Sequence, residues 1–115
     1  MKHFFLILAI FGFSVSFAQK LEYNDGKIFQ DGEQLSSFET KKVMENVSAI
    51  LKDAGMDLTN VVKTTIFIMN MGDFARINAV YGSYFDEATA PARETVQVAC
   101  LPKNVNVEIS MIAVK

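Results

Sequence analysis

The chain has few residues of the types that carry nucleophilic or metal-based chemistry. It contains one histidine, His3, one cysteine, Cys100, and no tryptophan. A metal site with several histidine ligands is therefore excluded. A catalytic cysteine–histidine pair is excluded from any domain that lacks the N-terminal His3. A single cysteine also excludes an intrachain disulfide, and we expect Cys100 to be a small buried residue. Phosphate-cradling glycine loops, paired-cysteine motifs and HExxH patterns are absent from the sequence.

Basic runs are missing as well. The 11 lysines and arginines are outnumbered by 13 acidic residues, for a formal net charge of -2. Nucleic-acid binding depends largely on cationic side chains that neutralise phosphates. The composition therefore argues against a nucleic-acid partner.

The N-terminus, MKHFFLILAIFGFSVSFAQ, has the three zones of an export signal. A basic start with Lys2 precedes an apolar run, and Ser16-Phe17-Ala18 places small residues before a cut ahead of Gln19. The run is too short for a stable membrane anchor. We therefore predict a signal peptide at residues 1–18, a domain at 19–115, and a periplasmic or secreted protein that does not bind membranes once cut. The alternative is a buried N-terminal strand or helix and a cytoplasmic protein.

Removal of the signal takes away Lys2 and His3. The mature chain then has 10 basic against 13 acidic residues, a net charge of -3, and no histidine at all. Its length of about 97 residues is typical of one domain, for which contacts between subunits would add stability.

Hydrophobic periodicity predicts the order ββαβαββ for this domain. The expected strands are residues 20–23, 27–30, 61–69, 93–100 and 105–114, and the expected helices follow Ser36–Glu39 up to Gly55 and run from about Phe74 to Phe85. Ser36 and Glu39 have the spacing of a capping box. Crossover helices and terminal hairpins favour a mixed sheet with both helices on one face. We expect the other face to pack against copies of the chain.

Two charged residues are candidates for the chemistry. Arg93 follows Pro91-Ala92 at a junction between a loop and a strand, where its guanidinium can hold a small carboxylate in a two-pronged hydrogen bond. Glu108 is a carboxylate inside an apolar strand, which we expect to fold back beside the strand of Arg93, and it could orient a water molecule. The structural alternatives are a solvated arginine and a rim glutamate.

At these residues the chain resembles the RidA family, also called YjgF/YER057c/UK114. The resemblance covers roughly the last 70 residues and is most specific in PARETVQVA, LPKNVNVEI and VVKTTIFI. It implies an α+β, chorismate-mutase-like fold in a homotrimer, with ligand clefts between subunits and no metal or organic cofactor. Members hydrolyse enamines and imines such as 2-aminoacrylate to 2-oxo acids and ammonia.

The resemblance also assigns roles to particular residues. Arg93 matches the arginine that binds the substrate carboxylate, and Glu108 matches the acid that places the attacking water. Thr95 occupies a position where many members have cysteine and where the family uses the backbone carbonyl.

The resemblance is weaker in the N-terminal part of the chain, where the GPYSQ-like segment and the SGQ motif of the family are missing. One placement sets residues 26–34 over the second strand of the family, with 31–34 in place of the SGQ motif. The other sets residues 13–17 there, which would exclude the signal peptide. Three functions remain open at this point: an imine deaminase, a non-catalytic trimer that binds small carboxylates, and a protein that acts on RNA. The acidic charge makes the third the least favoured.

Overall fold

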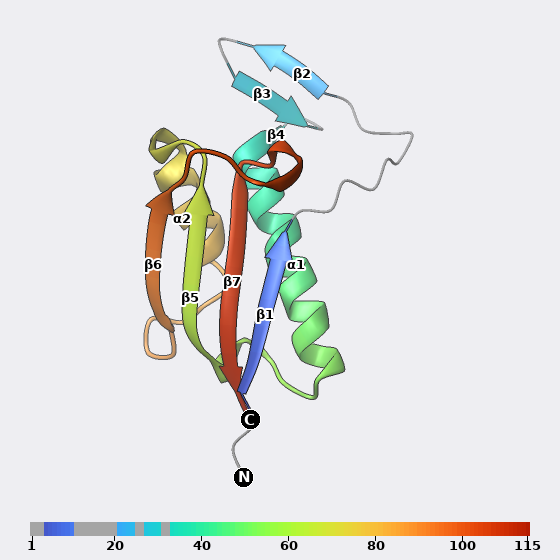
Figure 1. Cartoon of the computed structure of the whole chain (residues 1–115), viewed down its shortest axis with the longest axis vertical. Coiled ribbons are helices and arrows are strands. Elements are labelled where there is room, and N and C mark those ends of the chain that lie inside the picture. The colour runs from blue at the N-terminus through green and yellow to red at the C-terminus, as the bar shows by residue number, and fades with distance from the viewer. Residues whose placement is uncertain (1–3, 11–20, 25–26, 31–32) are drawn as a thin grey trace.

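A four-stranded mixed sheet with two helices on one face forms the body of the protein (Figure 1). The computed structural model describes residues 4–10, 21–24, 27–30 and 33–115. The strand order of the main sheet is β1-β7-β5-β6, and a second sheet has the order β2-β3-β4. In chain order the strands and helices are β1 (Phe4–Ile10), β2 (Leu21–Asn24), β3 (Lys27–Gln30), β4 (Glu33–Gln34), α1 (Leu35–Asp53), β5 (Val61–Ile68), α2 (Phe74–Gly82), β6 (Ala92–Gln97) and β7 (Val107–Val114). The short 3-10 helices are η1 (Leu58–Asn60), η2 (Met71–Asp73) and η3 (Pro102–Asn104).

The core lies between the helices and one face of this sheet. Helix α1 contributes an apolar stripe with Val43, Val47 and Leu51, all fully buried. Alternate residues of β7 are buried along its whole length, because side chains of a strand point to opposite faces in turn. The predicted helix before Gly55 and the strand predicted within residues 105–114 are therefore confirmed. Gly55, which follows α1, has a φ of 71° and is left-handed, as glycine at the end of a helix often is.

The start of α1 differs from the prediction. The helix begins at Leu35, directly after β4, and its N-cap is Gln34, whose side chain makes no capping hydrogen bond. Ser36 thus lies inside the first turn and cannot cap it, so the capping-box prediction is wrong. Glu39 instead accepts a hydrogen bond from the backbone N–H of Asn106 at 2.8 Å, which ties α1 to the segment before β7.

The strand order also corrects two expectations. The predicted hairpin of β2 and β3 forms, but with β4 it makes a separate sheet instead of joining the main one. Strands β6 and β7 do not pair with each other, because β5 lies between them, parallel to β6 and antiparallel to β7. The connection between β6 and β7 crosses the end of β5: Val98 donates a hydrogen bond to Ile68 and Met69 donates one to Asn106. Strands β5 and β7 thus each have a neighbour on both sides.

The N-terminal segment that includes β1 bears on the predicted export signal. Strand β1 pairs in antiparallel register with β7, from Phe4 opposite Val114 to Ile10 opposite Glu108. In the full chain it therefore covers the hydrogen-bonding edge of β7. Residues 11–20, which include the expected cut before Gln19 and the alternative strand at 13–17, lie outside the described residues. Removal of residues 1–18 stays a prediction.

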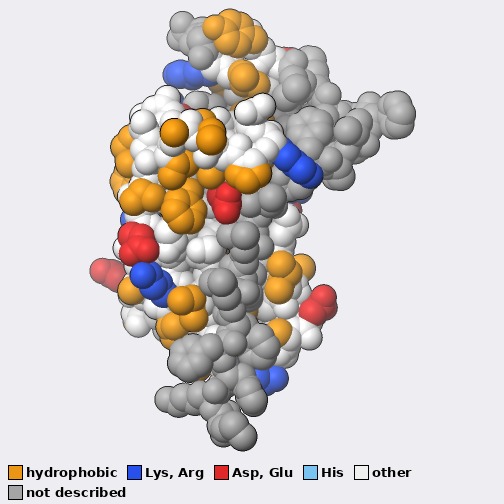
Figure 2. Space-filling model, in the orientation of Figure 1, with side chains coloured by type: hydrophobic (Ala, Val, Ile, Leu, Met, Phe, Trp, Pro, Cys, Tyr) orange, Lys and Arg blue, Asp and Glu red, His pale blue; other side chains and the backbone are white. Residues whose placement is uncertain are grey.

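The face of the sheet opposite the helices is not covered by other described elements. Hydrophobic side chains gather on it over the upper part of β5 and β6 (Figure 2). Phe67 and Ile112 are half-buried there, and Val96 is 42% exposed. Lys63 and Glu94 form an ion pair of 3.3 Å beside them. An apolar strip of this kind is typical of a surface that packs against another protein.

Cys100 is exposed, contrary to the expectation that it would be buried. It follows the end of β6 at Gln97, in the connection that leads to η3. The strand predicted to extend to residue 100 therefore ends three residues earlier, and the thiol lies outside the main sheet.

Candidate functional site: a guanidinium on an aromatic wall

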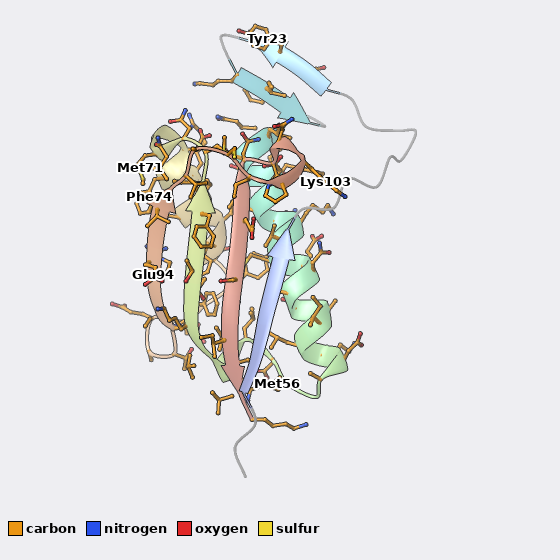
Figure 3. All side chains as sticks on the ribbon, viewed as in Figure 1. Tyr23, Met56, Met71, Phe74, Glu94 and Lys103 are labelled. Carbon is orange, nitrogen blue, oxygen red and sulfur yellow. The ribbon has the colours of Figure 1, made fainter. Side chains whose placement is uncertain are left out.

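Arg93 lies at the start of β6, on the side of the sheet that faces α2. Its position in the register is opposite Thr64, which is fully buried on that side. The guanidinium carbon lies 5.3 Å from the ring centroid of Tyr81 and 5.7 Å from that of Phe74, and Nη1 donates a hydrogen bond to Oδ1 of Asn78. Figure 3 shows Phe74 beside the upper part of β6, with Glu94 lower on the same strand. Cation–π contacts and the amide acceptor thus hold the guanidinium against α2.

The guanidinium faces a cavity of about 460 Å³. The walls come from the last turn of α2, the loop after it and the start of β6, namely Tyr81, Gly82, Phe85, Glu87, Ala90, Pro91 and Arg93. Pro91 ends the loop directly before the strand. The Tyr81 and Phe85 rings pack with centroids 4.9 Å apart. A rigid cation at the rim of a partly apolar cavity can bind the carboxylate of a small molecule.

Tyr81 connects this cavity to the core. Its hydroxyl donates a hydrogen bond of 3.0 Å to Oγ1 of Thr64. Burial raises the pKa of the Tyr81 hydroxyl, although the hydrogen bond with Thr64 and the positive charge of Arg93 act in the opposite direction. The phenol is therefore neutral at physiological pH and serves as a hydrogen-bond donor.

Thr95 lies two residues after Arg93 and shares its face of the sheet. It is opposite Ile66 in the register, and Ile66 is almost fully buried on the helix side. Oγ1 of Thr95 is buried and has no hydrogen-bond partner among the described residues. Arg93 and Thr95 thus lie on the same face of the sheet, and their joint role in binding a substrate stays a prediction.

Glu108 lies on the opposite face of the sheet. In the register it is opposite Phe67, on the face away from the helices. Strands lie about 4.8 Å apart and rise about 3.3 Å per residue, so two strands and three residues separate the Cα atoms of Arg93 and Glu108 by roughly 14 Å. The expectation that their strands are neighbours is wrong, and one chain alone does not bring the two side chains to one pocket.

Glu39, which was expected only to cap a helix, carries a buried carboxyl group. It is 4% exposed, and burial raises its pKa above the ordinary value of 4.5, against the effect of hydrogen bonds from Asn106. The negative charge of Asp73 raises it further. The folded protein therefore holds a proton on Glu39 to a higher pH than the unfolded chain does.

The replacement Glu39→Gln is expected to change how stability depends on pH. A raised pKa in the folded state gives stability that is present below pH 4.5 and is lost as the pH rises through the folded pKa. Glutamine keeps an oxygen acceptor for Asn106 and has no charge to bury. The stability of the variant relative to the original should therefore increase with pH until it levels off, as measured by urea denaturation from pH 4 to 8. Glu45→Gln, at an exposed ion pair with Lys42, is the control, and an equal gain in both variants would contradict the prediction.

In the described part of the chain, no helix is both long and apolar enough to cross a membrane. The residues that the structure describes contain no group of three or more His, Cys, Asp or Glu with the geometry to hold a metal ion.

A family model described as "Endoribonuclease L-PSP" matches residues 17–115 of the sequence. The chain belongs to this family, the YjgF/RidA family. The match begins after β1 and includes Arg93, Thr95 and Glu108. Membership confirms the α+β, chorismate-mutase-like fold predicted from the sequence.

Individual relatives of this RidA-family chain also support its membership of the family. A RutC family protein of Synechocystis is 55% identical over 83 residues, which cover 72% of this chain and 64% of the relative. The 2-iminobutanoate/2-iminopropanoate deaminase of Salmonella typhimurium is 47% identical over 81 residues, which cover 69% and 63%. The crystal structure of the Escherichia coli yjgF gene product is 35% identical with a TM-score of 0.68, covering 96% of this chain and 80% of that one. The chain thus spans a little under two thirds of the length of the two curated relatives.

Sequence reasoning missed the residues that hold Arg93 in place. Their three- and four-residue spacing is that of one apolar stripe of α2, which holds Phe74, Asn78 and Tyr81, and Tyr81 lies in the core. One signal was available in the sequence. Asn78 is a polar residue within that stripe, and an amide side chain that faces the protein interior normally has a hydrogen-bond partner. Its partner is the guanidinium of Arg93.

Proposed function

We propose that the protein is an enamine/imine deaminase, which hydrolyses 2-aminoacrylate-type intermediates to 2-oxo acids and ammonia. The observation that carries this proposal is the guanidinium of Arg93, held by Asn78 and two aromatic rings at the rim of a cavity. The deaminase of Salmonella typhimurium, 47% identical over the matched region, supports the same reaction.

The chemistry requires few groups from the protein. Arg93 binds the carboxylate of the imino acid and fixes the C2 carbon in the cavity. A water oxygen forms a bond to C2 while its proton goes to the carboxylate of Glu108, and the imine nitrogen takes up a proton. The amino nitrogen of the resulting carbinolamine then takes the proton back from Glu108, and the C–N bond breaks to release ammonia. The hydroxyl group loses its proton to water, which leaves the 2-oxo acid. A protonated imine is already electrophilic, so the reaction needs no histidine or thiolate.

We further propose that the site is completed between subunits of a homotrimer. Arg93 and Glu108 lie on opposite faces of the sheet in one chain, so a shared pocket requires Glu108 from a neighbouring subunit. The uncovered face of the sheet, which carries Glu108 with Phe67, Val96 and Ile112, offers an apolar strip for that contact. Among the described residues the Glu108 carboxylate has no hydrogen bond or ion pair, so it is available to a water molecule.

A second function is favoured by the separation of Arg93 from Glu108. If the trimer does not bring them together, the Arg93 cavity still has what a carboxylate-binding protein needs. The protein would then bind small 2-oxo acids without hydrolysing imines.

An ammonia-release assay with purified full-length protein distinguishes the two functions. An amino-acid oxidase generates 2-iminobutanoate in the assay. Semicarbazide traps the free imine, so slower formation of the semicarbazone reports faster hydrolysis of the imine. We expect the protein to increase the rate of ammonia release in proportion to its concentration, and light scattering to give the mass of three chains. Binding of 2-oxobutanoate without faster ammonia release would favour the binding protein, and faster RNA cleavage without either would contradict both.

We also propose that the protein is exported and that its mature form begins at Gln19. The family match begins at residue 17, close to the expected cut. N-terminal sequencing of the periplasmic fraction of an expressing bacterium should give Gln19-Lys20-Leu21. Cleavage would remove β1 and uncover the edge of β7. A cytoplasmic protein that starts at Met1 would contradict this proposal.

A further inference from the structure

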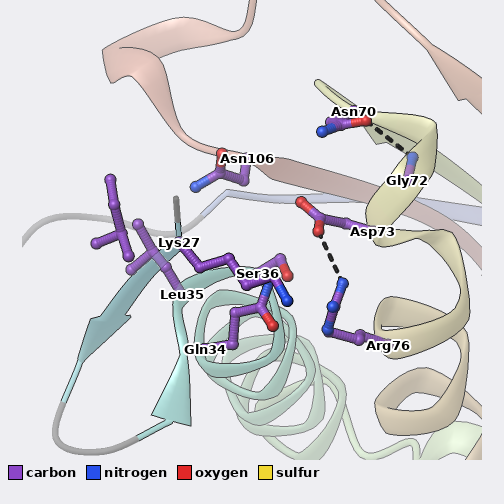
Figure 4. A pocket seen from close by; sticks show the side chains of 10 residues that line it. Lys27, Gln34, Leu35, Ser36, Asn70, Gly72, Asp73, Arg76 and Asn106 are labelled. Carbon is purple, nitrogen blue, oxygen red and sulfur yellow. Dashed lines mark hydrogen bonds and ion pairs between the residues drawn. The ribbon is translucent and has the colours of Figure 1, made fainter. Parts of the chain in front are cut away.

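A second cavity, of about 410 Å³, lies beside the first turn of α2, whereas the Arg93 cavity lies beside its last turn (Figure 4). It is formed by the first turn of α1, strand β3, and the η2 segment that leads into α2. It shares no lining residue with the Arg93 cavity. The two cavities are therefore separate sites.

Ser36 is a buried polar group on the wall of this cavity that lacks a partner. The residue is 3% exposed, and its Oγ has no hydrogen-bond partner among the described residues. Figure 4 shows it on the side of α1 that faces Asp73 and Arg76. Buried hydroxyl groups in folded proteins are normally hydrogen-bonded. A donor without a partner on a cavity wall therefore indicates a ligand that supplies an acceptor.

The electrostatics of the cavity favour a negatively charged ligand group. Helix α1 has 19 residues, no side-chain cap and no acidic residue in its first turn, so its N-terminal N–H groups are available. The N-terminus of a helix attracts anions through these groups and through the helix dipole. Lys27 and Arg76 add two positive charges to the lining.

Asp73 is an acidic residue of the lining, and it leaves Arg76 able to bind a further anion. Its Oδ1 accepts a hydrogen bond from Nη1 of Arg76 at 3.2 Å. A guanidinium has five N–H donors, so Arg76 can hold Asp73 and an additional oxyanion together. Asp73 thus fixes the arginine at the cavity.

We propose that this cavity binds the phosphate or carboxylate group of a small molecule. The oxyanion would lie between the first turn of α1 and Arg76, with Ser36 and Lys27 as further donors. The volume is in the range of small-molecule sites and exceeds the needs of a bare ion. The amide side chains of Gln34 and Asn106 on the same lining provide polar contacts for the rest of the ligand. This site is independent of the proposed deaminase reaction.

The test uses thermal denaturation of the full-length protein with inorganic phosphate or acetate as the probe, at an ionic strength kept constant with chloride. We expect saturable stabilisation by at least one of the two anions, and the effective anion identifies the group that the site takes. Arg76→Gln should weaken the apparent affinity about tenfold or more, since it removes a charge-assisted hydrogen bond, and Arg76→Lys should restore part of it. Ser36→Ala should weaken it about three- to tenfold.

Control variants separate binding from folding. Ser37→Ala changes the neighbouring residue and Lys41→Gln removes an exposed charge from the same helix, and neither residue lines the cavity. Both should bind the anion within about twofold of the original. Because Oγ of Ser36 has no partner, Ser36→Ala should not lower the melting temperature in chloride alone.

Three results would overturn the proposal. The first is the absence of saturable stabilisation by either anion, and the second is an unchanged response in both Arg76→Gln and Ser36→Ala. The third is a response that is lost in Arg93→Ala but kept in Arg76→Gln, since the anion would then occupy the other cavity.

Discussion

Replacement of Arg93 by alanine is expected to lower kcat/KM for 2-iminobutanoate by about 10- to 150-fold, because a hydrogen bond between charged groups contributes about 1.5–3 kcal/mol. The guanidinium is held by Asn78, Phe74 and Tyr81. It therefore loses little conformational freedom when the substrate binds. A two-pronged contact is lost entirely in the alanine variant. Ammonia release at a range of substrate concentrations gives the change.

Arg93→Lys is the matched variant for this prediction. It keeps the positive charge but replaces the planar fork by a single ammonium group, so we expect an intermediate loss. Lys41→Gln removes a positive charge far from the cavity and should leave kcat/KM unchanged. If the alanine variant hydrolyses the imine at the original rate, Arg93 has no part in the reaction.

Glu108→Gln is expected to lower kcat by about 100-fold or more, with a much smaller change in KM. General acid–base groups contribute about 10²- to 10⁴-fold to turnover, and glutamine keeps the shape of the side chain but cannot take a proton from water. The carboxylate of Glu108 has no partner among the described residues, so its loss should not weaken the fold. Equal melting temperatures of the two proteins check this point.

A mixing experiment tests whether Glu108 acts on a neighbouring subunit. Arg93→Ala and Glu108→Gln chains are unfolded together at equal amounts, refolded, and assayed against each variant alone. If every cleft takes its arginine and its acid from different chains, about a quarter of the clefts in random mixed trimers contain both groups. We expect about a quarter of the original activity, and recovery to no more than the average of the two variants would contradict a shared site.

Much of the fold could be predicted from local patterns. The β-branched run of VVKTTIFI indicates β5, and the spacing of Val43, Val47 and Leu51 indicates α1. Each pattern depends on neighbours a few residues apart, which lie on one face of a strand or helix. The boundaries were less accurate, as the end of β6 at Gln97 and the exposure of Cys100 show.

The candidate site was predicted only in part. Arg93 and Thr95 are two residues apart in one strand, so alternation alone places them on one face. Their relation to Glu108 depends on how many strands lie between them and on which face each residue points to, which local patterns do not determine. The order β1-β7-β5-β6 separates them.

The sequence by itself determined the type of the two helices and of β2, β3, β5, β6 and β7, the acidic charge, the scarcity of histidine and the residues that identify the family, because these depend on composition and on short-range spacing. Only the tertiary structure decided that β5 lies between β6 and β7, that Arg93 and Glu108 lie on opposite faces, and that Ser36 is buried beside Arg76 and Asp73. The physical reason is that these relations come from packing between segments far apart in the chain, where burial of apolar faces and completion of backbone hydrogen bonds select one arrangement among several that fit the local patterns equally well.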